Sequence, residues 1–78
     1  SSVYEKAVDR ALKSLKPRER EILLTYMMYK DGNKHLPDDV INSLCEKYQT
    51  TPVNLRKIKQ RALTEVERHI RINTSLLQ

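Results

Sequence analysis

The sequence predicts a small all-α domain of four helices. Its 78 residues include one glycine and three prolines, and they contain no tryptophan or phenylalanine. Strands and their turns ordinarily use more glycine, aromatic and β-branched residues, so this composition favours helices. In addition, apolar side chains recur at helical spacing through four segments that are separated by turn and cap residues. A chain of this length forms one domain with a modest core.

The first two predicted helices cover residues 3–15 and 17–30. In the first, an apolar stripe opposes a charged face, and Ser1 or Ser2 can cap its start. The stripe consists of Tyr4, Val8, Ala11, Leu12 and Leu15. The second helix begins at Pro17, because proline suits the first turn of a helix. Its predicted buried stripe consists of Ile22, Leu23, Tyr26 and Met27.

Leu24 and Met28 lie beside the buried stripe of the second helix. Two interpretations of their role are open. A helix that is apolar over more than one face can make a wide core contact. The same two side chains can instead form a docking surface for another protein. Methionine adapts to different partners, and exposed apolar patches mark interaction sites.

A third helix is predicted over residues 37–48, after a loop at residues 31–36. Within the loop, Asp31-Gly32 is a natural stop for the preceding helix. The acidic residues Asp38 and Asp39 suit the electropositive start of the third helix. Its inward face is predicted to consist of Val40, Ile41, Leu44, Cys45 and Tyr48.

A fourth helix is predicted from Pro52 to about Ile72, after a break at residues 49–51. Thr51 is a suitable N-cap and Pro52 a suitable first helical residue. Residues 73–78 are expected to form a frayed end. The short break between the third and fourth helices predicts a helix-turn-helix.

The positive charge of the chain is concentrated in this last segment. The chain has 15 Lys and Arg against 10 Asp and Glu, a net charge of +5. Residues 52–78 hold six cations and two anions, a net charge of +4, whereas residues 1–51 hold nine and eight. The apolar arc of the fourth helix is formed by Leu55, Ile58, Ala62, Val66 and Ile70. Opposite it lie Lys57, Gln60, Arg61, Thr64 and Arg68. Such a basic face is typical of a surface that binds an anionic partner such as nucleic acid. An ordinary solvated surface of a helix can have the same composition.

The candidate DNA contacts follow from the way a helix enters the major groove. Residues near the start of the helix touch base edges, while flanking cations and helix N-termini hold phosphates. The residues expected at base edges are Val53, Asn54 and Lys57. The residues expected at phosphates are Thr51, Arg56, Lys59 and Arg61. Lys59 falls inside the apolar arc, so its side chain is expected to extend along the flank of the helix.

No enzyme activity, metal site or cofactor is predicted. His35 and His69 lie far apart in the chain, and Cys45 lies on an apolar helical face. One cysteine cannot form an internal disulfide, and no apolar run approaches the roughly 20 residues of a transmembrane helix. We therefore expect a protein of the reducing cytoplasm. The start at Ser-Ser rather than Met suggests a domain excised from a longer chain.

Two stretches carry a family pattern: LKPREREIL at residues 15–23 and NSLCEKYQTTPVNLRKIKQRAL at residues 42–63. They resemble region 4 of bacterial sigma-70-type RNA polymerase sigma factors. Thr51 matches the cap of the recognition helix in that family. The pairs Leu55-Arg56 and Ile58-Lys59 match its Val-Arg and Ile-Lys pairs, and Arg61-Ala62-Leu63 matches its Arg-Ala-Leu triplet. The PREREIL start also occurs in LuxR-type transcriptional regulator domains, whereas IKQRAL favours the sigma family.

The resemblance implies a function in transcription initiation. Such a domain places RNA polymerase on the minus-35 element of a promoter, through the major groove of double-stranded DNA. It also docks on the flap of the polymerase β subunit, for which Leu24 and Met28 are candidates. An anti-sigma factor is a further candidate partner, and the isolated domain is expected to be monomeric. The alternative is a sigma-like protein-interaction module that docks polymerase or a regulator without strong DNA specificity.

The chain departs from the family pattern at the turn and at the start of the fourth helix. Gln49 and Thr50 replace the glycine and the Ile or Val that are usual in the turn, and a non-glycine residue adopts a left-handed conformation only at a cost. Pro52 and Val53 stand where the family often reads bases through Arg and Glu, and Lys57 stands in place of Gln. Lys57 can donate to guanine O6 or N7, whereas Pro52 and Val53 cannot make the usual hydrogen bonds. We therefore expect recognition to differ from the usual hexamer, to be weaker, or to depend more on phosphate contacts.

Overall fold

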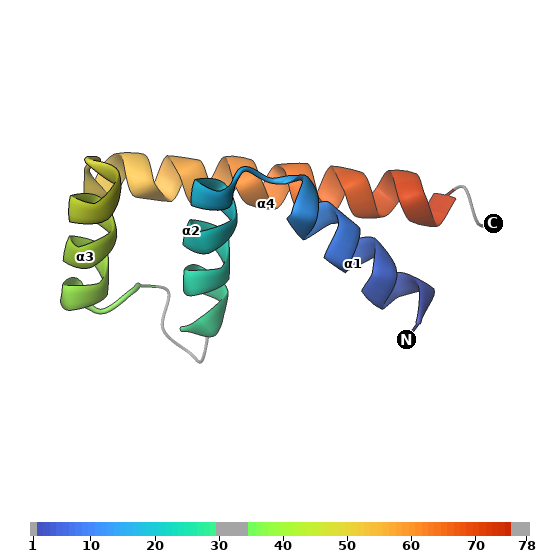
Figure 1. Cartoon of the computed structure of the whole chain (residues 1–78), viewed down its shortest axis with the longest axis horizontal. Helices are drawn as coiled ribbons and strands as arrows, with labels where there is room; N and C mark the ends of the chain where they lie inside the picture. Colours follow the sequence, from blue (N-terminus) through green and yellow to red (C-terminus); the bar gives the residue numbers. More distant parts are fainter. Residues whose placement is uncertain (1, 30–34, 76–78) are drawn as a thin grey trace.

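The computed structural model describes residues 2–29 and 35–75, which form four α-helices and no strand (Figure 1). The helices are α1 (Val3–Ser14), α2 (Pro17–Met28), α3 (Asp38–Tyr48) and α4 (Pro52–Ser75). The all-α prediction is confirmed. The 24 residues of α4 span about 36 Å at about 1.5 Å per residue, and the longest dimension of the molecule is 43 Å. Each of the other three helices contacts α4, which makes α4 the spine of the fold.

The starts of α1 and α2 are capped by nearby side chains. At α1, the amide of Glu5 donates to Oγ of Ser2 at 3.0 Å. At α2, the amide of Lys16 donates to Oε1 of Glu19 at 3.1 Å, and Pro17 occupies the first helical position. Each bond supplies an acceptor for a backbone N–H that has none within its own helix. The predicted serine cap is therefore confirmed at Ser2.

Three helix ends differ slightly from the predicted ones. α1 ends at Ser14, because Leu15 already adopts extended backbone with ψ of 150° before the Lys16-Pro17 pair. α2 ends at Met28, and the predicted stop at Asp31-Gly32 lies outside the described residues. α4 continues past Ile72 to Ser75.

The turn between α3 and α4 is closed by two backbone hydrogen bonds. The amide of Gln49 donates to the carbonyl of Glu46 at 3.4 Å, and the amide of Thr50 donates to the carbonyl of Cys45 at 3.0 Å. These bonds form a Schellman motif, which glycine usually completes. Here Gln49 takes the left-handed conformation, with φ of 51° and ψ of 53°. Its side-chain Nε2 also donates to the carbonyl of Glu46, at 2.8 Å. The absence of glycine therefore does not alter the turn, because Gln49 itself takes the left-handed conformation.

We expect Gln49→Gly to raise the free energy of unfolding by about 1 kcal/mol, because glycine adopts positive φ without a clash between Cβ and the backbone. Denaturant unfolding followed by circular dichroism measures the change. The matched control is Gln60→Gly on the exposed side of α4, which should lower the free energy of unfolding by about 1 kcal/mol. A destabilised Gln49→Gly variant would contradict the strain assigned to this turn.

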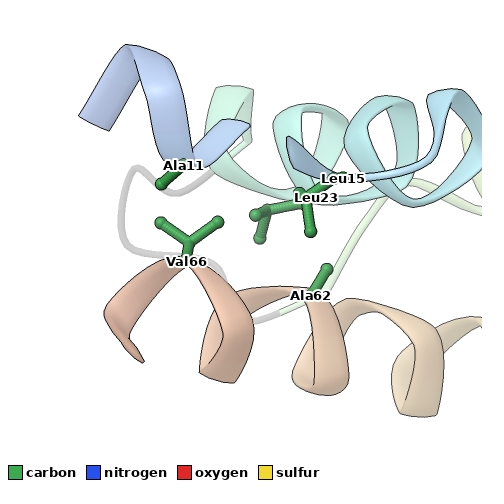
Figure 2. Packing of buried hydrophobic residues seen from close by; sticks show 5 residues of the cluster. All are labelled: Ala11, Leu15, Leu23, Ala62 and Val66. Carbon is green, nitrogen blue, oxygen red and sulfur yellow. The ribbon is translucent and has the colours of Figure 1, made fainter. Parts of the chain in front are cut away.

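Two clusters of buried apolar side chains attach the other helices to α4. The first consists of Ala11, Leu15, Leu23, Ala62 and Val66. Figure 2 shows Ala62 and Val66 of α4 facing the other three side chains. The second cluster consists of Ile22, Leu36, Leu44, Leu55 and Ile58. Since α4 contributes to both clusters, its predicted apolar arc holds it in place along most of its length.

Four positions differ from the predicted core, and one of them is Leu36, which was expected in the loop but is buried in the second cluster. Tyr4 was expected in the apolar stripe of α1, yet its side chain is 61% exposed, because the N-terminal end of α1 diverges from α4 (Figure 1). Ala7 is buried instead, and its small side chain suits a close approach of two helices. Met27 was expected in the buried stripe of α2 and is 51% exposed, near the end of α2 that points away from α4.

Candidate nucleic-acid interface

One side of α4 is covered by no other helix. In Figure 1, α1, α2 and α3 all extend from the same side of α4, which is the side of its buried apolar arc. We call the opposite side the outer face. It consists of the exposed residues Val53, Arg56, Lys57, Gln60, Arg61, Thr64, Glu67, Arg68 and Arg71. The predicted polar cluster of α4 therefore lies together on one exposed surface.

The outer face is strongly basic, since it carries five cations and one anion. The distance along α4 from Lys57 to Arg71 is about 21 Å at about 1.5 Å per residue. Lys57 and Arg61 make no hydrogen bond or ion pair with any described residue, which leaves both side chains available to an external anion. Exposed cations without an intramolecular partner attract the phosphates of a nucleic acid.

The charge of Arg68 is partly neutralised by a neighbour. Its Nη2 and Nε donate to the two carboxylate oxygens of Glu65 at 2.5 and 3.2 Å. This contact lowers the pKa of Glu65, so the carboxylate stays ionised and paired. His69 also approaches Glu65, with Nε2 at 3.6 Å. The unpaired positive charge of the outer face is therefore greatest in the first half of α4, toward the turn.

The start of α4 brings together most of the residues predicted to touch DNA. Oγ1 of Thr51 accepts a hydrogen bond from the amide of Asn54 at 3.2 Å, which confirms Thr51 as the N-cap. The hydroxyl proton of Thr51 remains available to an external acceptor such as a phosphate oxygen. Val53 is 54% exposed and offers an apolar surface of the kind that can contact a thymine methyl group. Nδ2 of Asn54 also donates to Oγ1 of Thr50 at 2.8 Å, a contact that was not predicted from the sequence.

Lys59 is placed differently from the other predicted phosphate-binding residues. Its Nζ lies 5.2 Å from the ring centroid of Tyr26 on α2, within the range of a cation–π interaction. Its side chain is half-buried, as expected for a lysine inside the apolar arc. Burial raises the pKa of Tyr26, and the charge of Arg56 opposes this rise. Lys59 therefore joins α4 to α2, whereas Arg56 and Arg61 remain exposed on the outer face.

A polar clasp holds the first half of α2 against the end of α3. Both carboxylate oxygens of Glu21 accept hydrogen bonds from Nζ of Lys47, at 2.8 and 3.1 Å. The hydroxyl of Tyr48 donates to Oε1 of the same carboxylate. The hydrogen bonds from Lys47 and then Tyr48 hold the pKa of Glu21 below its usual range. Because Tyr48 ends α3 directly before the turn, the clasp helps to fix the start of α4.

We expect Glu21→Gln to lower Tm by a few degrees near neutral pH, through loss of the ion pair with Lys47. The lowered pKa of Glu21 means that its contribution to stability is present above about pH 4.5 and is lost as the pH falls through the folded-state value. The difference in Tm between variant and parent should therefore shrink in acid. Thermal unfolding at several pH values measures it. Asp9→Asn, which removes an ion pair confined to α1, is the control and should leave Tm near the parental value. An equal difference at every pH would contradict the clasp.

An exposed apolar patch lies on α2. We use the name α2 patch for Leu24, Met27 and Met28, of which Met28 is 77% exposed. Leu24 and Met28 also line a shallow hollow beside Arg20 and Glu21. The wide-core interpretation of Leu24 and Met28 is therefore wrong, because both side chains face solvent. Their role as a docking surface stays a prediction.

Within residues 2–29 and 35–75, no group of three or more His, Cys, Asp or Glu side chains is placed to hold a metal ion. No helix of the described chain combines the length and apolar character needed to cross a membrane. Cys45 is a free thiol, half-buried on α3 and packed against the second apolar cluster.

Comparison with known proteins finds no relative of this chain. No protein-family model, curated protein or solved structure matches it. The function is therefore inferred from the geometry of α4 together with the sequence pattern.

Proposed function

We propose that this chain is a DNA-binding domain of the helix-turn-helix type, with α4 as the recognition helix. The observation that carries the proposal is the outer face of α4. It is exposed along the helix, it bears the excess positive charge of the chain, and Lys57 and Arg61 on it have no partner among the described residues. The major groove of B-DNA is wide enough to admit an α-helix in this way.

The proposed individual contacts are those expected from the sequence, and the exposure of the side chains supports them. Asn54 and Lys57 lie within the first two turns of α4 and face base edges, with Val53 in apolar contact beside them. Thr51, Arg56 and Arg61 hold phosphates and fix the orientation of the helix without reading sequence. Lys59 contributes through its contact with Tyr26, which joins α4 to α2.

We infer from the sequence resemblance that this DNA binding serves transcription initiation, as in region 4 of a sigma factor. The target is then a promoter element at the minus-35 position, and the place of action is the nucleoid. Because Pro52 and Val53 stand where the family reads bases through Arg and Glu, the preferred sequence should differ from the usual hexamer. Lys57 favours a guanine, through its O6 or N7.

The test is a titration of the domain with promoter-sized DNA duplexes at two salt concentrations. The proposal predicts affinity that falls as salt rises and that differs between sequences. Salt-dependent binding without sequence preference would leave only nonspecific attraction. Absence of binding at low salt would overturn the proposal for this domain.

The exposed α2 patch supports a second function, that of a protein-interaction module. The patch exposes the apolar side chains of Leu24, Met27 and Met28 together, and exposed apolar patches mark interaction sites. Methionine side chains are flexible and can adapt to an apolar groove or helix of a partner. The flap of the polymerase β subunit is the partner that the resemblance implies, and an anti-sigma factor is another. Loss of polymerase binding in Met28→Lys, with DNA binding unchanged, would support this function.

A further inference from the structure

The side chain of Asn54 is held in one orientation by the residue one turn before it. Nδ2 of Asn54 donates to Oγ1 of Thr50 at 2.8 Å. The backbone on both sides is fixed as well, since the amide of Asn54 donates to Oγ1 of Thr51 and the amide of Thr50 donates to the carbonyl of Cys45. A carboxamide held by this hydrogen bond, on a backbone that is itself fixed, has less rotamer freedom for binding to remove.

The bond to Thr50 leaves part of the Asn54 carboxamide available. An asparagine side chain has two N–H donors and one carbonyl oxygen that accepts. Thr50 takes one donor, so one N–H and Oδ1 remain. The side chain is exposed at the start of α4, at the edge of the outer face on the side of Arg61, where these two groups can meet a ligand.

One donor beside one acceptor matches a single base in the major groove. Adenine presents N7, which accepts, next to the N6 amino group, which donates. Guanine presents two acceptors, which would leave Oδ1 facing O6. Cytosine offers only a donor, which would pair with Oδ1, and thymine offers only an acceptor, which would pair with the remaining N–H. Each base would therefore leave one of the two groups without a partner.

We propose that Asn54 reads an adenine through N6 and N7, and that Thr50 is the residue that positions the Asn54 carboxamide for this contact. The inference rests on the proposed DNA-binding function and specifies the base that one part of the interface takes. Lys57 lies three residues further along α4 and remains the residue that favours guanine.

The experiment begins with selection of the preferred duplex from a random pool by the parent domain. Each adenine of that duplex is then replaced, one at a time, by 7-deazaadenine, in which C–H replaces N7. We expect one replacement to weaken parental binding about tenfold and the others to have little effect. Binding of Asn54→Ala should be insensitive to that same replacement. Lys57→Ala, the matched control, should retain the parental sensitivity to it.

The role of Thr50 is tested by two substitutions. Thr50→Val keeps the shape and the backbone bond to Cys45 but removes the hydroxyl, and it should reduce the sensitivity to 7-deazaadenine. Thr50→Ser restores the hydroxyl and should restore the sensitivity. Since the readout compares two duplexes with the same protein, a general loss of stability does not produce it.

The outcomes separate this inference from the DNA-binding proposal. If the parent prefers certain sequences but no adenine replacement depends on Asn54, the adenine contact is overturned while the DNA-binding function stands. If Thr50→Val keeps full sensitivity, the positioning role is overturned. If the parent selects no sequence at all, the proposed function fails and the adenine contact fails with it.

Discussion

Leu55→Ala is expected to lower the free energy of unfolding by roughly 2–5 kcal/mol, the range for a truncated leucine in a rigid core. Leu55 is fully buried, and it packs in the second apolar cluster with Ile22, Leu44 and Ile58. Native domains are stable by only about 0.05–0.15 kcal/mol per residue, so this loss is a large part of the total for a chain of this length. The variant should be substantially unfolded at temperatures at which the parent is native.

The control for Leu55→Ala is Val53→Ala, two residues earlier on the same helix. Val53 is 54% exposed, so its truncation should change the free energy of unfolding by no more than about 0.5 kcal/mol. Denaturant unfolding of both variants gives the comparison. Similar stabilities of the two variants would show that Leu55 does not anchor α4, and the assignment of the outer face would then be wrong.

Lys57→Ala is expected to remove about 1–3 kcal/mol of discrimination between guanine and other bases at one position of the preferred DNA site. Lys57 lies on the outer face near the start of α4, and it has no intramolecular partner among the described residues to replace the lost contact. The measurement is the affinity of parent and variant for duplexes that differ at single positions. Equal affinity of the variant and the parent for every duplex would contradict the orientation given to α4.

Arg61→Ala is the matched comparison for Lys57→Ala, because it removes a second exposed and unpaired cation one turn further along α4. A phosphate contact carries no sequence information, so this variant should bind all duplexes more weakly by a similar factor. The slope of the logarithm of affinity against the logarithm of salt concentration should fall by about one unit. A change of sequence preference in Arg61→Ala would instead place Arg61 at a base edge.

Local chemistry explains why much of the fold could be predicted from the sequence. A threonine followed by a proline and an apolar repeat indicates the start of a helix. α4 begins at such a pair, Thr51-Pro52. The turn itself was not predicted in this form, because the Schellman motif places a left-handed residue at Gln49 although glycine usually takes that position. Helical spacing alone separates the buried arc of α4 from its outer face.

The errors come from contacts between helices that are distant in sequence. Met27 and Tyr4 satisfy the helical period, but each lies near a helix end that points away from α4, and only the arrangement of the helices decides that (Figure 1). Lys59 could be placed on the flank of α4, yet its aromatic partner Tyr26 belongs to α2. The bond between Thr50 and Asn54 spans four residues across a helix start. An i,i+4 polar pair was the one signal in the sequence that could have indicated it.

Backbone amide chemical shifts during titration with the preferred duplex test most directly whether the outer face of α4 is the surface that binds DNA. The largest shift changes should fall on residues 50–64, and those of Leu24 and Met28 on the α2 patch should be small. Changes confined to the α2 patch, or an unchanged spectrum at low salt, would show that the outer face does not bind DNA.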